Sequence, residues 1–357
     1  MSQDFLSVLS LRLPIFQAPM AGVSTPALAA AVSEAGGLGA LGLGASTPQA
    51  AAKAIAQTRA LTARAFNVNL FCHAPARRDP ALEQAWIARS HPMFARFDAE
   101  PPAHLQEIYR SFLEDDAMLQ VLLESRPKVI SFHFGLPDPD RIAALRDTGA
   151  LLVASATSVD EARQIAGAGL DAVVAQGWEA GGHRGIFDPE ATDAQLSTEA
   201  LTRQIARDLA LPVISAGGLM QGADVARALD WGAVAAQLGT AFVACPESAA
   251  DAAYRQRIAE GGDTVMTAAI SGRPARCLHN DFTDWTADVP DNQLPAYPCA
   301  YDLGKALNAA AKAKGQTGFG AQWAGMNVTG SRALPAADLM ATLEQEFHAA
   351  REDAWNI

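Results

Sequence analysis

The chain has 357 residues, half of them hydrophobic, and 39 aspartate and glutamate residues against 27 lysine and arginine residues give a formal net charge of −12. So acidic a chain is poorly suited to bind nucleic acid or an anionic membrane. No apolar run approaches the roughly 18 residues that span a bilayer, and the N-terminal Met-Ser-Gln-Asp-Phe lacks the features of a signal peptide. We therefore expect a cytoplasmic protein that binds neither nucleic acid nor a membrane.

Short apolar runs alternate with alanine-rich helical segments along most of the chain. The pattern predicts eight strands, at residues 14–20, 38–43, 65–71, 129–135, 151–156, 172–176, 212–216 and 233–238. Seven helices are predicted, at residues 26–35, 48–61, 115–124, 139–148, 159–168, 198–210 and 223–231. Ser197 or Thr198 is expected to cap one of these helices, and Ser158-Val-Asp-Glu161 is typical of a capping box.

Apolar strands separated by helices indicate a parallel sheet that is covered on both faces. Eight such units favour a TIM barrel, with an open doubly wound sheet as the alternative. Residues 1–71 and 115–245 are predicted to form the barrel. Residues 72–114 and 246–357 fall outside the repeat, and we expect them to form a lid or a second, mostly helical subdomain at the C-terminal ends of the strands.

The four cysteines, Cys72, Cys245, Cys277 and Cys299, are far apart in the sequence and include no C-x-x-C pair. This usage fits a reducing compartment and gives no indication of a zinc site. We therefore expect free thiols and no bound metal.

A glycine-rich segment, Gln176-Gly-Trp-Glu-Ala-Gly-Gly-His-Arg-Gly185, follows the sixth predicted strand. Glycines let backbone N–H groups approach a ligand closely, and neighbouring N–H groups can bind an anion. Histidine has the side-chain pKa nearest to neutrality. The segment on its own is compatible with a plain surface turn or with a cofactor-dependent active site.

Four other predicted strands also end in segments that could contact a ligand. Ser215-Ala-Gly-Gly-Leu219 and Gln237-Leu-Gly-Thr240 follow strands seven and eight, where TIM barrels bind phosphate groups through backbone N–H groups. Ala18-Pro-Met-Ala-Gly22 offers a flat apolar surface, and Asn67-Val-Asn69 offers amide groups for the edge of a heterocycle. Together these segments predict a planar, phosphorylated cofactor across the mouth of the barrel.

These motifs, with Pro14-Ile-Phe-Gln-Ala-Pro-Met-Ala-Gly22 and Asn67-Val-Asn-Leu-Phe71, resemble the nitronate monooxygenase family, formerly called 2-nitropropane dioxygenases. Tyr297-Pro-Cys-Ala-Tyr-Asp-Leu-Gly-Lys305 resembles its class I branch. The resemblance implies a TIM barrel with FMN that oxidises alkyl nitronates with O2 to an aldehyde or ketone and nitrite. Propionate 3-nitronate is the substrate that it implies.

The resemblance assigns residues as well. His183 matches the family's catalytic base, which would remove the α-proton of a neutral nitroalkane or orient a nitronate that is already an anion. The implied FMN contacts, with Met20 and Ala21 near the flavin ring, are Met20, Ala21, Asn69, Gln176, Gly181, Gly182, Gly217, Gly218, Gln237, Leu238, Gly239 and Thr240.

Five further side chains are candidates for binding the substrate. His133 ends the fourth predicted strand, and Tyr109 lies in the long insertion. Tyr301 and Lys305 are one turn apart on a predicted helix after Tyr297, and two phenols with an ammonium would bind a carboxylated nitronate. Arg273 and Arg276 receive no chemical role, and the oligomeric state is not predicted.

Three alternative functions stay open on the sequence. The first is a flavin barrel that uses NAD(P)H to reduce a quinone or an enoyl thioester. The second is a Schiff-base phosphosugar lyase, which is disfavoured because the only lysine beside a predicted strand, Lys128, stands at its start. The third is a flavin carrier without catalysis, which would have no need of His183 or a lid.

Overall fold

The computed structural model describes residues 2–353, so residue 1 and residues 354–357, at the ends of the predicted barrel and second subdomain, lie outside it. Eight strands form a parallel sheet in the order β1-β9-β8-β6-β5-β4-β3-β2. Their bounds are β1 (Ile15–Gln17), β2 (Gly39–Gly42), β3 (Phe66–Phe71), β4 (Val129–His133), β5 (Leu151–Ala156), β6 (Ala172–Gln176), β8 (Val213–Ala216) and β9 (Ala235–Leu238).

The sheet closes on itself between its first and last strands. Phe16 of β1 pairs in a parallel bridge with Leu38, the residue before β2. Gln17 N donates to Leu38 O at 2.9 Å, and Leu38 N donates to Ile15 O at 3.0 Å. A doubly wound sheet would leave these edges apart, so the prediction of a TIM barrel is confirmed.

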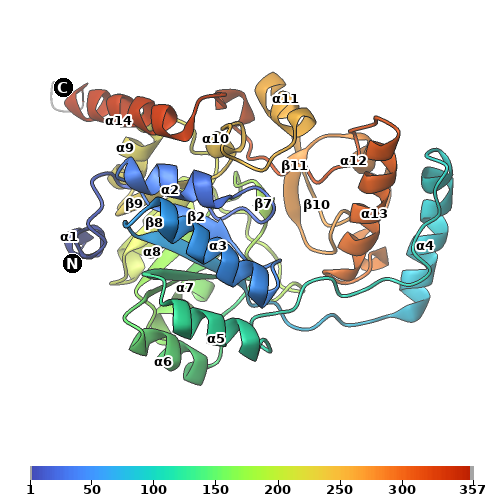
Figure 1. Ribbon diagram of the computed structural model, residues 1–357, viewed down its shortest axis with the longest axis horizontal. Coiled ribbons are helices and arrows are strands. Elements are labelled where there is room, and N and C mark those ends of the chain that lie inside the picture. The colour runs from blue at the N-terminus through green and yellow to red at the C-terminus, as the bar shows by residue number, and fades with distance from the viewer. Residues whose placement is uncertain (1, 354–357) are drawn as a thin grey trace.

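The outer layer of the barrel is formed by helices (Figure 1), and eight of them belong to it. They are α2 (Pro26–Glu34), α3 (Pro48–Leu61), α5 (Asp116–Ser125), α6 (Pro139–Asp147), α7 (Val159–Gly167), α8 (Thr198–Asp208), α9 (Gly222–Asp230) and α14 (Ala336–Asp353). Leu339 and Leu343 of α14 share a buried cluster with Val225 of α9 and Leu28 of α2. Helix α14, which the sequence analysis placed with the second subdomain, therefore packs on the barrel as its eighth helix.

The N-terminal end of the barrel is closed by the start of the chain. Helix α1 (Ser2–Val8) carries Phe5, and Leu9 follows it. Both side chains are buried in a cluster with Val129 and Val174 from the barrel strands. The C-terminal ends of the strands are therefore the end at which a ligand can enter.

Two insertions cover that end. One lies between β3 and α5 and contains α4 (Pro80–Ala95). The other lies between β9 and α14 and contains α10 (Thr240–Val243), α11 (Ala252–Glu260), β10 (Thr264–Thr267), β11 (Ala275–Leu278), α12 (Asp281–Trp285), η1 (Asp291–Gln293), α13 (Cys299–Ala313) and η2 (Val328–Gly330).

The two insertions pack against each other beside the barrel. Figure 1 shows α4 alongside α13 and α12 at the right of the molecule. Trp86 of α4 stacks on Trp285 of α12 with ring centroids 5.4 Å apart, and both contact a cluster that includes Leu303 of α13. We propose that α4 and the segment from α10 to η2 form the second subdomain.

One more strand links the barrel to this subdomain. In the glycine-rich segment, β7 (Gly182–His183) pairs antiparallel with β11, which pairs with β10. His183 lies opposite Ala275, and Gly182 lies opposite Arg276. The loop that carries the predicted catalytic histidine is therefore fixed as the edge of a three-stranded sheet.

Local capping explains where some helices begin. Ser197 caps α8, because Ala200 N donates to its Oγ at 3.1 Å as predicted. The capping box at Ser158 is only half formed. Glu161 N donates to Ser158 Oγ, but the Glu161 carboxylate accepts from Thr157 N and from Phe187 N at 2.6 and 2.8 Å. The predicted box is wrong because that carboxylate holds the loop after β6 instead.

Among residues 2–353, no helix has both the length and the apolar character that crossing a bilayer requires. The four cysteines are free thiols, and all four are buried. Within the same residues, no three histidine, cysteine, aspartate or glutamate side chains are grouped so that they could bind a metal ion.

Candidate active site

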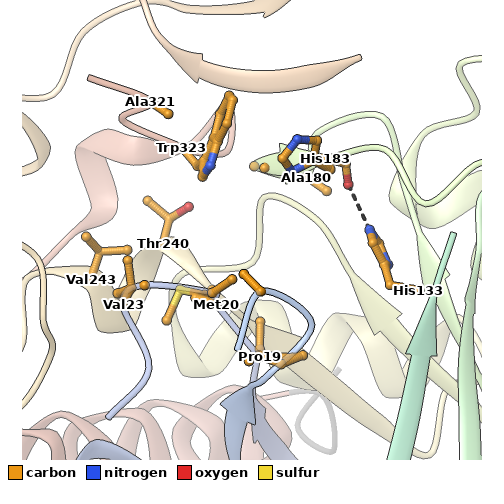
Figure 2. A pocket seen from close by; sticks show the side chains of 18 of the residues that line it. Pro19, Met20, Val23, His133, Ala180, His183, Thr240, Val243, Ala321 and Trp323 are labelled. Carbon is orange, nitrogen blue, oxygen red and sulfur yellow. Dashed lines mark hydrogen bonds between the residues drawn. The ribbon is translucent and has the colours of Figure 1, made fainter. Parts of the chain in front are cut away.

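A cavity of about 630 Å³ lies at the C-terminal ends of the barrel strands, beneath the insertions. Figure 2 shows Pro19 and Met20 on one side of it and Trp323 on the opposite side, with His183 and His133 at one end. The space between Met20 and Trp323 is a slot with apolar and aromatic walls. Such a slot suits a planar ring system.

Nearly all of the predicted site residues line this cavity. They are Met20, Ala21, Asn69, Gln176, Gly181, Gly182, His183, Gly217, Gly218, Gln237, Gly239 and Thr240, together with Tyr109, His133, Tyr297, Tyr301 and Lys305. Leu238 is not among the lining residues, because its fully buried side chain packs in the core between strands and helices. Successive strand side chains point to opposite faces, so Gln237 faces the cavity and Leu238 faces away.

One wall of the cavity is a set of backbone donors. The N–H groups of Gly218, Gly239 and Thr240 have no acceptor among residues 2–353. Gly218 has φ of +67°, and a Cβ there would lie 3.0 Å from the Cβ of Glu179. Unpaired N–H groups at the ends of β8 and β9 fit a phosphate group, whose oxygens would accept from them.

A loop of the second insertion completes this wall. Gly325 N donates to Thr240 Oγ1 at 2.9 Å, and Asn327 Nδ2 donates to Gly218 O at 2.7 Å. This loop was not predicted, because it lies more than 80 residues from the residues that it contacts, Gly218 and Thr240. It leaves the N–H groups of Gly218 and Thr240 free while holding other atoms of both residues.

The two predicted amide side chains are partly occupied by the protein. Asn69 Nδ2 donates to Ser131 Oγ at 2.9 Å. Gln176 Nε2 donates to His183 O at 2.9 Å, and Gln176 Oε1 accepts from Gly185 N at 2.7 Å. Gln176 therefore holds the glycine-rich loop in place in addition to lining the cavity.

His183 lies between aromatic rings at the end of the cavity. Its ring centroid is 4.9 Å from that of Trp323 and 5.5 Å from that of Tyr297, and its Nε2 lies 2.9 Å from Ser271 Oγ. Burial, with smaller effects from nearby His133 and Arg273, lowers the pKa of His183 to about 3. The imidazole is therefore neutral at neutral pH and able to accept a proton.

His133 has a different contact from the predicted one. Its Nε2 lies 3.2 Å from the His183 carbonyl oxygen, and because a carbonyl only accepts, Nε2 is the donor (Figure 2). Burial lowers the pKa of His133 to about 4. Its Nε2 is thus occupied by the backbone of His183, while its ring lines the cavity, so the contact with the substrate stays a prediction.

The three candidate tyrosines and Lys305 gather on the subdomain side of the cavity. Lys305 Nζ lies 4.9 Å from the ring centroid of Tyr109 and 5.2 Å from that of Tyr301. The hydroxyl of Tyr297 is buried and has no partner among the described residues. Burial raises the pKa of Tyr297 well above its ordinary value, so this hydroxyl keeps its proton and remains a donor for a ligand.

Helix α13 begins at Cys299, with Pro298 as its N-cap. Pro298 has φ of −98° and ψ of 21°, which lies outside the helical range. Tyr301 and Lys305 still fall one turn apart on the same face, and both line the cavity.

Comparisons with known proteins agree with this geometry. Residues 3–346 match the family model described as nitronate monooxygenase. The chain belongs to the nitronate monooxygenase family. The family is generally flavin-dependent, and its members are enzymes that act on small molecules.

Similar proteins cover nearly the whole chain. A nitronate monooxygenase of Paraburkholderia phytofirmans is 57% identical over 344 residues, which cover 96% of this chain and 94% of the relative. One of Pseudomonas aeruginosa is 51% identical, with 97% and 99% covered. A crystal structure of nitroalkane oxidase from Streptomyces ansochromogenes has a TM-score of 0.88 and 38% identity, with 98% and 99% covered.

Some residues at this nitronate monooxygenase site were not predicted. Arg273 is buried with its guanidinium 4.4 Å from the ring centroid of Phe134, and its Nη2 donates to Ile186 O at 2.9 Å. Burial lowers the pKa of Arg273 to about 10. Arg276 instead donates to Trp178 O at 2.9 Å. Arg276 therefore has a structural contact, whereas Arg273 lies close behind the histidines.

Proposed function

We propose that this member of the family binds FMN without a covalent bond and uses O2 to oxidise alkyl nitronates to an aldehyde or ketone and nitrite. Propionate 3-nitronate is the proposed substrate. One observation carries the proposal. A single cavity combines unpaired backbone donors at Gly218, Gly239 and Thr240 with His183 and Lys305 on other walls.

The cavity fits FMN better than a dinucleotide. It offers one set of unpaired N–H groups for one phosphate, and the slot between Met20 and Trp323 accepts a planar ring (Figure 2). When bound, FMN supplies the redox chemistry between the nitronate and O2. The role of the protein is to hold the two reactants together and to control protons and water around them.

Lys305 and the tyrosine hydroxyls are suited to the carboxylate of propionate 3-nitronate. Lys305 Nζ is held near Tyr109 and Tyr301 by cation–π contacts, so the cationic and phenolic groups already lie together. A carboxylate would accept charge-assisted hydrogen bonds from them. This end of the substrate would then be fixed, with its reactive carbon directed toward His183.

The role of His183 depends on whether the substrate is a neutral nitroalkane or a nitronate. With a neutral nitroalkane, the α C–H bond breaks, the proton passes to the imidazole, and the electron pair delocalises onto the nitro group to give the nitronate. With a preformed nitronate no proton is removed, and His183 orients the anion. The nitroalkane oxidase among the similar structures supports testing neutral nitroalkanes as well.

One experiment tests the function. The protein is purified, its visible spectrum is recorded, the released chromophore is identified, and O2 uptake is assayed with propionate 3-nitronate, with a nitroalkane and with NADH. We expect yellow protein, FMN as the released chromophore, and O2 uptake and nitrite formation with the nitronate. Anaerobic bleaching by NADH would favour the reductase alternative. Bound flavin without any turnover would favour a carrier.

A further inference from the structure

Ser271 lies directly behind the catalytic histidine. Its side chain is fully buried, and its Oγ is 2.9 Å from His183 Nε2 and 3.2 Å from the backbone carbonyl oxygen of Arg273. Arg273 N also approaches the same Oγ, at 3.5 Å. The hydroxyl is thus shared between the imidazole and a turn of the second subdomain.

The proton of this hydroxyl has one favourable direction. A carbonyl oxygen only accepts, and no other donor to Arg273 O is found among residues 2–353. If the hydroxyl pointed at His183, this buried carbonyl would lose its hydrogen bond, which costs free energy. The hydroxyl therefore donates to Arg273 O and presents a lone pair to His183, so Nε2 must carry a proton.

The other ring nitrogen is then the free one. Within residues 2–353, the only hydrogen bond of the His183 ring is the one between Nε2 and Ser271 Oγ, and His183 lines the cavity. Because Nε2 holds the only proton of the neutral ring, Nδ1 has the lone pair that can accept the α-proton of a substrate. After that transfer, the imidazolium would still donate from Nε2 to Ser271.

We propose that Ser271 is a positioning residue that fixes His183 as the Nε2–H tautomer and so directs the basic Nδ1 into the cavity. The catalytic role of Ser271 in this proposal rests on the proposed function. Catalytic bases are commonly oriented by a neighbouring hydrogen-bonding group. Here that group is the neutral hydroxyl of Ser271, which is itself oriented by the backbone carbonyl of Arg273. It also gives a role to the turn that leads to Arg273, to which the sequence assigned no chemistry.

The turn is built to hold that hydroxyl in place. Gly272 has φ of +91°, and a Cβ there would lie 2.5 Å from Tyr297 N and 2.6 Å from Pro295 O. Only glycine fits without displacing the segment before α13. The backbone that follows Ser271 is therefore fixed, and the bond to Arg273 O is made within the turn.

The test reads the tautomer directly. In wild-type protein labelled with ¹⁵N-histidine, two-bond ¹H–¹⁵N correlation spectra at pH 6–8 should show His183 protonated at Nε2 and unprotonated at Nδ1, with His183→Asn used for assignment. Ser271→Ala should add the Nδ1–H tautomer. A wild-type His183 protonated at Nδ1, or an unchanged tautomer in Ser271→Ala, would overturn the proposal.

Kinetics give a second readout. Ser271→Ala should lower kcat/KM for a neutral nitroalkane by roughly 10- to 100-fold, as misplacing a catalytic group does, and should affect preformed nitronates less. Ser271→Thr keeps the hydroxyl and should recover much of the rate. Ser90→Ala, which removes another buried hydroxyl bonded to a backbone carbonyl, is the matched control and should change neither readout. If wild-type protein oxidises no nitronate, the proposed function fails, whereas the tautomer measurement still decides the role of Ser271.

Discussion

His183 is a neutral imidazole held by bonds at both its backbone and its ring. Replacing it with asparagine removes the proton acceptor but keeps a polar side chain of similar size. We expect His183→Asn to lower turnover of neutral nitroalkanes by roughly 10²- to 10⁴-fold, as for a lost general base. Preformed nitronates should be affected less, because they have no proton to lose. O2 uptake on both substrate forms measures the difference, and visible absorbance confirms that flavin stays bound. Equal losses would mean that His183 only positions the substrate.

The depressed pKa of His183 has a consequence for the pH profile. Its pKa is lowered to about 3, mainly by burial, so the free enzyme holds the neutral base at every pH well above that value. We therefore expect kcat/KM for a neutral nitroalkane to show no acid limb between pH 5 and pH 8. Initial rates across this range, at constant ionic strength, check it. A limb with an apparent pKa near 6.5 would show that solvent reaches the imidazole.

The residues of the site differ in how far sequence could identify them. His183 and Gly218 lie in short contiguous motifs at strand ends, so their local sequence carries the signal. Ser271 and Trp323 lie 88 and 140 positions after His183, counted from their numbers, and contact it only through the packing of the second subdomain. No local pattern predicts such contacts, because they depend on how two distant segments meet.

At the scale of elements, α13 presents Lys305 to the cavity. Lys305→Met keeps much of the length of the side chain and removes its charge. A charge-assisted hydrogen bond contributes about 1.5–3 kcal/mol, and because Lys305 is partly exposed to solvent we expect the lower end, so KM for propionate 3-nitronate should rise roughly tenfold. Propyl-2-nitronate, whose tail has no charge, should show almost no change. Steady-state kinetics on both substrates check this. A similar rise for both would assign Lys305 to the fold or the flavin.

The turn after β8 should control binding of FMN. An alanine at position 218 would meet the side chain of Glu179 and would strain a backbone with φ of +67°. We expect Gly218→Ala to weaken FMN binding at least tenfold, about 1.4 kcal/mol or more, by displacing its N–H group. Fluorescence titration of the flavin-free protein measures it.

Gly149 provides the control for that change. It has φ of +83°, a Cβ added there would have no atom within 4 Å, and it lies before β5 at the opposite end of the barrel. Gly149→Ala carries the same kind of backbone strain but should leave FMN affinity unchanged. Equal losses of affinity in both variants would indicate general destabilisation instead of a local effect on the phosphate site.

The predictions for β5 and β6 were the most accurate among the barrel strands. The bounds of β5 and β6 agree with the prediction, because these apolar runs end at polar or glycine-rich segments. The prediction for β1 was too long, since the strand ends at Gln17. Pro19 has no N–H to pair, and Met20 O accepts from Val23 N and Ser24 N in a turn. The short strand β7 was missed because its partner, β11, lies about 90 residues later.

At the scale of the whole molecule, the barrel and the insertions meet around a cluster of three histidines, of which His73 is buried and His133 and His183 are half-buried. His73 comes from the first insertion, His133 from β4 and His183 from the glycine-rich segment. All three rings lie within 6.3 Å, centroid to centroid, of the ring of Phe134. Arg273 from the second insertion lies over the same ring, at 4.4 Å. Four segments that are distant in sequence therefore place ionisable groups in one poorly hydrated region.

This cluster should make the protein sensitive to mild acid. Burial is the largest cause that lowers the pKa of His73 and His133 to about 4 and of His183 to about 3, from an ordinary value of 6.5. Between these values and 6.5, the unfolded chain binds protons that the folded protein does not, so stability falls as pH decreases. We expect each histidine to lower the free energy of unfolding by roughly 1–2 kcal/mol between pH 7 and pH 5. Most carboxylates stay ionised in this range.

Urea unfolding at pH 7 and pH 5 measures this loss, and the decisive quantity is the difference between the two pH values, not the stability at either one. His73 is the residue to change, because both of its ring nitrogens are buried without a partner in the described structure and it does not line the cavity. The free energy of unfolding of His73→Asn should fall less between pH 7 and pH 5 than that of the wild type. The difference should be roughly the 1–2 kcal/mol expected of one histidine. His104→Asn, which alters an exposed histidine of the same insertion, should behave as the wild type. The same pH dependence in all three proteins would show that the buried histidines are not the acid-sensitive groups, and the loss would then have to come from the carboxylates.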